Sequence, residues 1–151
     1  MPVSLEADPV RRRLIVSVPP NVRWSHMEKA VLDAVQRAPE LTGWDWIIDD
    51  QGPIDDVDVA GMARIGAVFR ALAAGPAHAT HTVVVTTDPF FGPWAQVMDH
   101  HYGGRRHHGA PTLQAALSLL DRLQSPNAKR DSAESRRVGN AAVSSSSPDL
   151  R

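Results

Sequence analysis

The segment from Trp44 to Leu72 constrains the fold more than any other part of the chain. It opens with a short apolar run that ends in two carboxylates, continues through an aspartate-rich loop and leads into Val59 and the residues after it. Met62, Ile65 and Phe69 then recur at the spacing of an amphipathic helix. A strand followed by such a helix is the repeating unit of α/β domains, so we expect an α/β fold.

The segments on either side of this unit repeat the alternation of strand and helix. Asp8-Pro9 separates two apolar or alternating runs and predicts an opening β-hairpin. Ser25 and Glu28 have the spacing of a capping box and predict the first helix. The small residues Ala60, Gly61, Ala63, Gly66 and Ala67 predict a slim second helix that approaches a sheet closely. Further strands are expected at 44–48, 81–87 and 105–108, and further helices at 58–74, from the cap at 88–89 to 103, and at 112–123.

The predicted order is β-β-α-β-α-β-α-β-α, which implies a mixed central sheet covered by helices. Composition changes after Leu123, because residues 124–151 contain no aromatic residue, no isoleucine and a single leucine. A segment with so few apolar side chains cannot offset the entropy lost on ordering. We therefore predict one domain over 1–123 and a disordered polar tail over 124–151.

Overall composition limits the classes of function. The net charge of −1 does not favour a nucleic-acid-binding protein. The chain has no cysteine, which excludes disulfides, thiolate metal sites and cysteine nucleophiles. No apolar run reaches the roughly 18 residues that a membrane span requires. We expect a cytoplasmic protein with no membrane span and no nucleic-acid partner.

Residues 58–61 read Asp-Val-Ala-Gly and stand where the second helix is expected to begin. With the predicted element order, this pattern resembles the STAS domain, the fold of sulfate transporters and anti-sigma-factor antagonists. More narrowly it is similar to the SpoIIAA-like bacterial proteins of uncharacterised role, over about residues 3–123. In STAS regulators this helix begins Asp-Ser-Ser-Gly, and a partner kinase phosphorylates the second serine. The resemblance places Asp58 and Gly61 on the Asp and Gly, and Val59 and Ala60 on the serines.

The departure from that pattern affects the expected function. Ala60 has no hydroxyl, so serine phosphorylation at this position is chemically impossible. Asp55, Asp56 and Asp58 already supply the negative charge that the N-terminus of a helix favours. The resemblance then implies a non-enzymatic regulatory module, without a cofactor, that acts through a protein partner or through self-association.

Two paired aspartates suggest a cation site. Asp49 and Asp50 end a predicted strand, and carboxylate oxygens at such a position are ligands for Mg²⁺. An aspartate phosphoacceptor of the receiver type also needs a lysine, and the chain has only Lys29 and Lys129, outside the relevant strand ends. The adjacent pairs His100-His101 and His107-His108 do not specify a zinc site, which needs three or four convergent ligands. His107 and His108 are neighbours on a predicted strand and therefore point to opposite faces. We expect no bound metal, and a Mg²⁺-dependent phosphoacceptor is the least favoured alternative.

Aromatic and basic residues provide a further alternative. Phe90, Phe91 and Trp94 follow a predicted strand, at the edge where open α/β sheets bind ligands. Arg105 and Arg106 form a local basic patch. Core packing explains the aromatic residues, and solvated strand edges explain the arginines. Together, however, the five side chains would suit a surface for a partner, or a carrier or sensor of a small apolar or anionic ligand.

Overall fold

A computed structural model describes residues 2–52, 54, 56–73 and 79–125 of the chain. Within these ranges the protein is an α/β domain with a five-stranded mixed sheet and four α-helices, as the sequence predicts. Residues 126–151 of the predicted tail and residue 74, where the second helix is expected to end, lie outside the described residues. The elements are β1 (Ser4–Asp8), β2 (Arg13–Val18), α1 (Trp24–Arg37), the 3₁₀ helix η1 (Pro39–Gly43), β3 (Asp45–Asp50), α2 (Val59–Leu72), β4 (Thr80–Val85), α3 (Phe91–Tyr102), β5 (Arg105–Ala110) and α4 (Leu113–Gln124).

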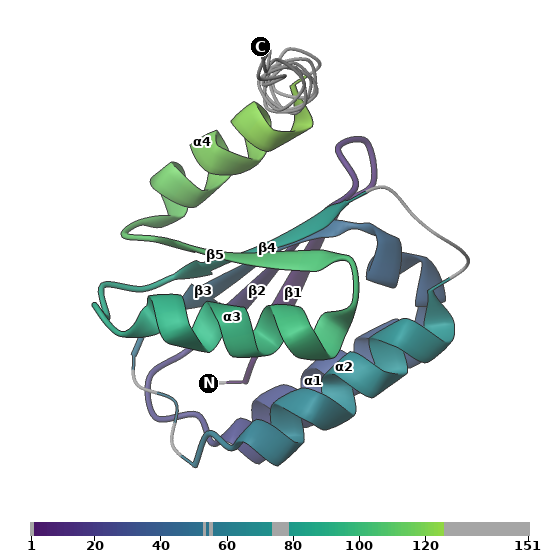
Figure 1. The fold of residues 1–151 in the computed structure, drawn as a ribbon, viewed down its shortest axis with the longest axis vertical. Helices are drawn as coiled ribbons and strands as arrows, with labels where there is room; N and C mark the ends of the chain where they lie inside the picture. Colours follow the sequence, from purple (N-terminus) through teal and green to yellow (C-terminus); the bar gives the residue numbers. More distant parts are fainter. Residues whose placement is uncertain (1, 53, 55, 74–78, 126–151) are drawn as a thin grey trace, which may run out of the picture.

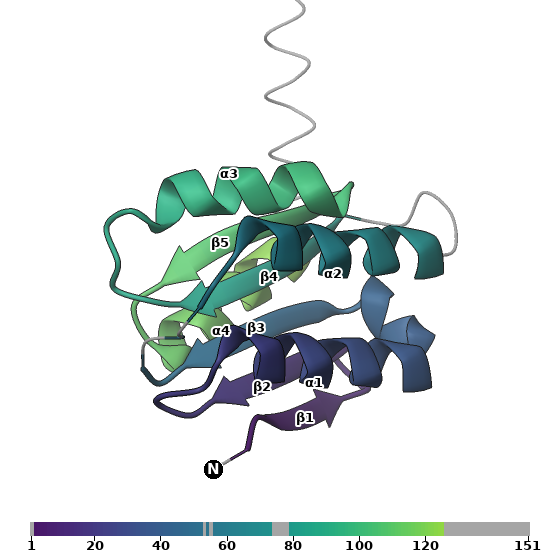
Figure 2. The same cartoon turned by 90° about the horizontal axis from the view of Figure 1, so that it is seen from below.

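The strands lie in the sheet in the order in which they occur in the sequence. β1 and β2 form the predicted antiparallel hairpin, and β2, β3, β4 and β5 are parallel. Each parallel strand is added on the same side of the previous one, and right-handed crossovers then place their helices on one face. Figure 1 shows α1, α2 and α3 on that face and α4 on the other. Figure 2 shows α1, α2 and α3 lying side by side over the sheet.

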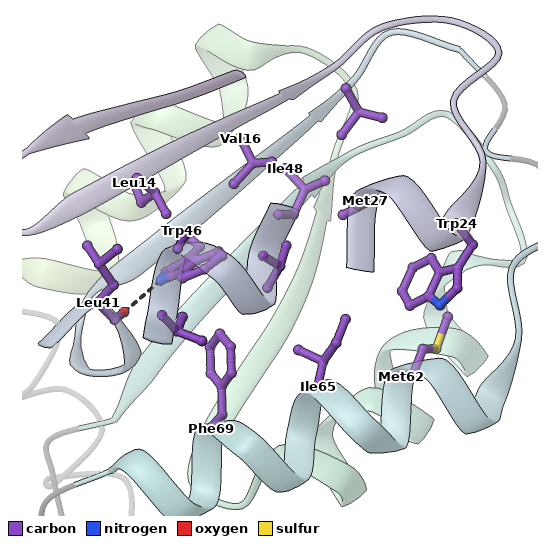
Figure 3. Packing of buried hydrophobic residues seen from close by; sticks show 14 of the residues in the cluster. Leu14, Val16, Trp24, Met27, Leu41, Trp46, Ile48, Met62, Ile65 and Phe69 are labelled. Carbon is purple, nitrogen blue, oxygen red and sulfur yellow. Dashed lines mark hydrogen bonds between the residues drawn. The ribbon is translucent and has the colours of Figure 1, made fainter. Parts of the chain in front are cut away.

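The two faces of the sheet bury separate apolar clusters. The larger cluster lies under α1, α2 and α3 and includes Trp46 and Ile48 of β3, which face Ile65 and Phe69 of α2 (Figure 3). The smaller cluster packs β3 and β4 against Leu120 of α4. In both clusters the side chains alternate along the strands, as expected for a sheet covered on both faces. None of the helices in the described ranges is long and apolar enough to cross a membrane.

Two helix starts differ from the sequence predictions. α1 begins at Trp24, and its N-cap residue Arg23 makes no side-chain cap. The predicted capping box at Ser25 is therefore wrong, because Glu28 instead accepts two hydrogen bonds from Arg64 of α2, at 2.7 and 3.0 Å. α3 begins at Phe91, two residues after the expected Pro89. The carboxylate of Asp88 accepts from the backbone N–H of Phe90 at 2.9 Å and closes a turn before the helix.

The small residues of α2 serve helix packing. A Cβ at Gly61 would lie 2.0 Å from Nε1 of Trp24 in α1, and one at Gly66 would lie 2.6 Å from the carbonyl oxygen of His101 in α3. Both distances are far below van der Waals contact, so glycine is required for these approaches. The two glycines thus bring α2 close to its neighbouring helices, where the sequence had suggested an approach to the sheet.

Candidate ligand pocket

A pocket of about 740 Å³ lies between the sheet and the three helices α1, α2 and α3. Its volume is within the range of pockets that hold small organic ligands. Apolar side chains from both layers form most of its wall. Figure 3 shows several of them packed between α2 and the sheet. The apolar lining residues include Trp24, Met27, Trp46, Ile48, Met62, Ile65, Phe69, Val84, Phe91, Trp94 and Met98.

One end of the pocket is polar. Asp50 at the end of β3 and the residues after β4 line it, including Thr86, Thr87 and Asp88. The carboxylate of Asp50 accepts a hydrogen bond from the backbone N–H of Gly52 at 3.2 Å. Partial burial nevertheless raises the pKa of Asp50 above its ordinary value, because the ionised form loses hydration. This end lies at the carboxyl ends of β3 and β4, where ligands of open α/β sheets bind.

Another part of the wall contains the buried histidine His107, which is paired with a partly buried carboxylate. His107 of β5 lines the pocket, and its Nδ1 lies 2.9 Å from Oδ1 of Asp99 in α3. The same oxygen accepts from the backbone N–H of His107 at 2.7 Å. Burial lowers the pKa of His107, although the bond to Asp99 acts in the opposite direction. Tyr102, whose pKa is raised by burial, packs edge-on against His107 with ring centroids 4.9 Å apart.

The structure separates the two halves of the surface expected from Phe90, Phe91, Trp94, Arg105 and Arg106. The three aromatic residues lie at the start of α3, next to the polar end of the pocket. Arg105 and Arg106 begin β5, at the amino ends of the parallel strands and so at the opposite end from the aromatic residues. A single surface that combines the aromatic and basic residues is therefore not formed.

Arg105 is an interior residue, only 4% exposed, and so does not contribute to a surface. Its guanidinium donates to the backbone oxygens of Thr42, Trp44 and His81 and to Oγ1 of Thr82, at 2.8–3.1 Å. It also lies 5.2 Å from the ring centroid of Phe69. Burial lowers the pKa of Arg105 to about 10, so the group remains charged at neutral pH. Arg106, in contrast, is exposed and lies 3.6 Å from Asp99.

The aromatic residues divide into lining and exposed groups. Phe91 and Trp94 line the pocket, and Trp94 remains 39% exposed at its mouth. Phe90, the N-cap residue of α3, is 71% exposed. Core packing, the simplest explanation from the sequence, therefore does not account for Phe90.

The aspartates do not converge. In the ranges that the structure covers, no group of three or more histidine or carboxylate side chains is placed to hold a metal ion. Asp45 is buried on the α4 side of the sheet and accepts from His81 N and from Nε2 of Gln124. Asp50 faces the pocket, while Asp58 caps α2. Asp55 lies outside the described residues. This dispersion gives no support to the weak cation candidates Asp49 and Asp50 or to the phosphoacceptor alternative.

Several pocket residues were missed in the sequence. Trp24, Met98 and His107 come from three different elements, and their spacing is that of core positions. The indole N–H of Trp24 is buried without a hydrogen-bond partner among the described residues. Apolar periodicity alone does not separate a packed core from a lined pocket, because both require the same face of each helix.

The positions matched to the STAS pattern lie at the start of α2. Asp58 accepts a hydrogen bond from the backbone N–H of Gly61, which confirms the helix start expected there. Val59 and Ala60 are exposed in the first turn, and neither carries a hydroxyl. Comparison of the chain with family models, curated proteins and solved structures finds no match in any of the three.

Proposed function

We propose that this chain is a non-enzymatic STAS-like module that acts by binding a small, largely apolar molecule. The observation that carries the proposal is the pocket of about 740 Å³ between the sheet and α1, α2 and α3. The ligand chemistry follows from its wall, where aliphatic and aromatic side chains outnumber a few polar groups at defined positions. Ligand pockets commonly have this composition.

Energetics also support an occupant. Apolar side chains at a solvent-open pocket keep part of their surface in water and make fewer dispersion contacts than side chains in a packed core. A bound apolar molecule restores those contacts and removes its own surface from water. Trp94 lines the pocket and is 39% exposed, which provides an apolar surface between solvent and the interior.

The STAS-like part of the proposal rests on the element order and on Asp58 and Gly61 at the start of α2. The absence of a hydroxyl at Val59 and Ala60 supports a role without the serine switch of STAS regulators. In this proposal, occupancy of the pocket replaces phosphorylation as the signal that the module carries.

Titration of the full chain with Nile red, a neutral apolar fluorophore, tests the binding role. Val84 lies on β4 and lines the pocket, so Val84→Phe should fill part of it and weaken binding by about tenfold, equivalent to about 1.4 kcal/mol. Val10→Phe makes the same change at a hairpin valine that is 93% exposed and should leave binding unchanged. Trp94→Ala, at the exposed mouth, provides a second pocket variant that avoids the core. Equal binding by all four proteins would contradict the proposal.

A second candidate function is protein contact, including self-association. The exposure of Phe90, at 71%, favours it, because a large aromatic side chain in solvent is typical of interaction surfaces. Sedimentation of the full chain over a range of concentrations should show association that Phe90→Ser abolishes. Val10→Ser, at another exposed apolar position, is the matched control. A chain that stays monomeric at all concentrations would remove the self-association role.

A further inference from the structure

Among the residues that the structure describes, the lysine, arginine and carboxylate side chains in the pocket wall are of one sign. Asp50 and Asp88 are the acidic residues in its wall, and no described lysine or arginine lines it. His107 also lines the pocket, but burial lowers its pKa and favours the neutral ring at neutral pH. The polar end therefore attracts a positive group and repels a negative one. This charge pattern disagrees with the anionic ligand considered from the sequence.

The Asp50 carboxylate has few partners among the described residues. Its carboxylate accepts one backbone hydrogen bond, from Gly52, and forms no ion pair with any residue that the structure describes. A carboxylate has about four acceptor sites, so most of those on Asp50 remain for water or a ligand. Because the group is partly buried, an ammonium donor would replace hydration that the fold has already removed.

Aromatic rings line the pocket together with this carboxylate. Phe91 and Trp94 come from the first turn of α3, which follows the polar segment after β4. Aromatic faces attract cations, and the attraction is stronger where water is excluded. The cation of Arg105 lies behind the rings of Trp46 and Phe69, away from the carboxyl ends of the strands. Both features favour a positive ligand group at the Asp50 end.

From this arrangement we infer that the pocket selects an amphiphile with a protonated amine, whose apolar body lies against the partly exposed lining residues Val84, Trp94 and Met98 and whose ammonium group binds Asp50. The inference rests on the proposed function, since it names the ligand class of the same pocket. A charge-assisted hydrogen bond is stronger than a neutral one, so the amine should bind more tightly than the alcohol of equal chain length.

Decylamine, decanol and decanoate share one alkyl chain and differ in head group, so they test this selectivity by competition with Nile red on the full chain. We expect decylamine to bind about tenfold more tightly than decanol, and decanoate to bind most weakly. Asp50→Asn should abolish the advantage of decylamine over decanol. Asp49→Asn changes the neighbouring carboxylate, which does not line the pocket, and should preserve the advantage.

The outcomes separate the inference from the proposed function. If Nile red and all three amphiphiles fail to bind, the proposed function is lost and the inference with it. If they bind but decanoate equals or exceeds decylamine, the pocket remains a binding site and the amine inference is overturned. Retention of the amine preference in Asp50→Asn would also overturn it, because the preference would then arise elsewhere.

Discussion

Gly66 of α2 lies directly against the backbone of α3, where a Cβ on Gly66 would stand 2.6 Å from the carbonyl oxygen of His101. Gly66 thus permits the close approach of two of the three helices that cover the pocket. Because the opposing atom belongs to the backbone, no side-chain rotation can relieve a larger residue at this position. The short spacing between α2 and α3 therefore depends on the absence of a Cβ at Gly66.

Gly66→Ala should destabilise the protein by about 1–3 kcal/mol, since overpacking forces the two helices apart. Urea unfolding followed by circular dichroism measures the change. Gly92→Ala, in the first turn of α3, is the matched control because a Cβ there meets no atom within 4 Å. That variant should be neutral or stabilising by about 0.5–1 kcal/mol, since alanine loses less backbone entropy than glycine. Equal effects of the two substitutions would contradict the close approach.

Arg105→Met should destabilise the protein by about 3 kcal/mol, because three backbone carbonyls and the hydroxyl of Thr82 lose a buried donor. Arg105→Lys should recover little of this loss, since an ammonium cannot reproduce the planar fork of a guanidinium. Arg106→Met removes the neighbouring exposed arginine and should change stability by less than about 0.5 kcal/mol. Comparable losses at 105 and 106 in chemical denaturation would refute the interior role of Arg105.

Stability should fall as the pH drops below about 6.5, the ordinary pKa of histidine. Burial lowers the pKa of His81, His107 and His108 in the folded protein, so the unfolded chain binds more protons in this range. Nδ1 of His81 and Nε2 of His108 lie 3.0 Å apart, an arrangement in which one ring nitrogen accepts a hydrogen bond from the other. Protonation of both rings removes that acceptor.

Melting temperatures measured between pH 7.5 and 5 would check this dependence. His108→Gln should flatten the profile, whereas His26→Gln, at an exposed position in α1, should leave it unchanged. A profile that is flat in the unmodified protein, or that rises toward low pH, is the opposite of what the buried histidines require.

The element order was predictable because periodicity and turn residues act locally. Asp8-Pro9 predicted the hairpin, and the apolar stripe of α2 predicted the buried Met62, Ile65 and Phe69. The role of Glu28 was not predictable, since its partner Arg64 lies 36 residues away and the cap pattern at Ser25 was locally sufficient. Glu28 therefore forms the tertiary contact with Arg64 in place of the local capping interaction.

The candidate site was only partly predictable. Phe91 and Trp94 were identified from their place after a strand, and they do line the pocket. Arg105 was grouped with Arg106 as a basic patch, but successive residues of a strand point to opposite faces, and Arg105 points into the interior. The sequence did not predict the lining residues Trp24, Thr82 and Met98, because they line one pocket only once the sheet and helices are assembled.

The most direct test of the binding proposal uses the four tryptophans of the chain as internal reporters. Trp24, Trp46 and Trp94 line the pocket, whereas Trp44 does not. Nuclear magnetic resonance of the ¹⁵N-labelled full chain, titrated with decanol, follows each indole N–H separately. A ligand in the pocket should shift the three lining indoles with a common saturation curve and leave Trp44 in place. Unchanged indole signals, or a shift of Trp44 as large as the others, would contradict the pocket as the binding site.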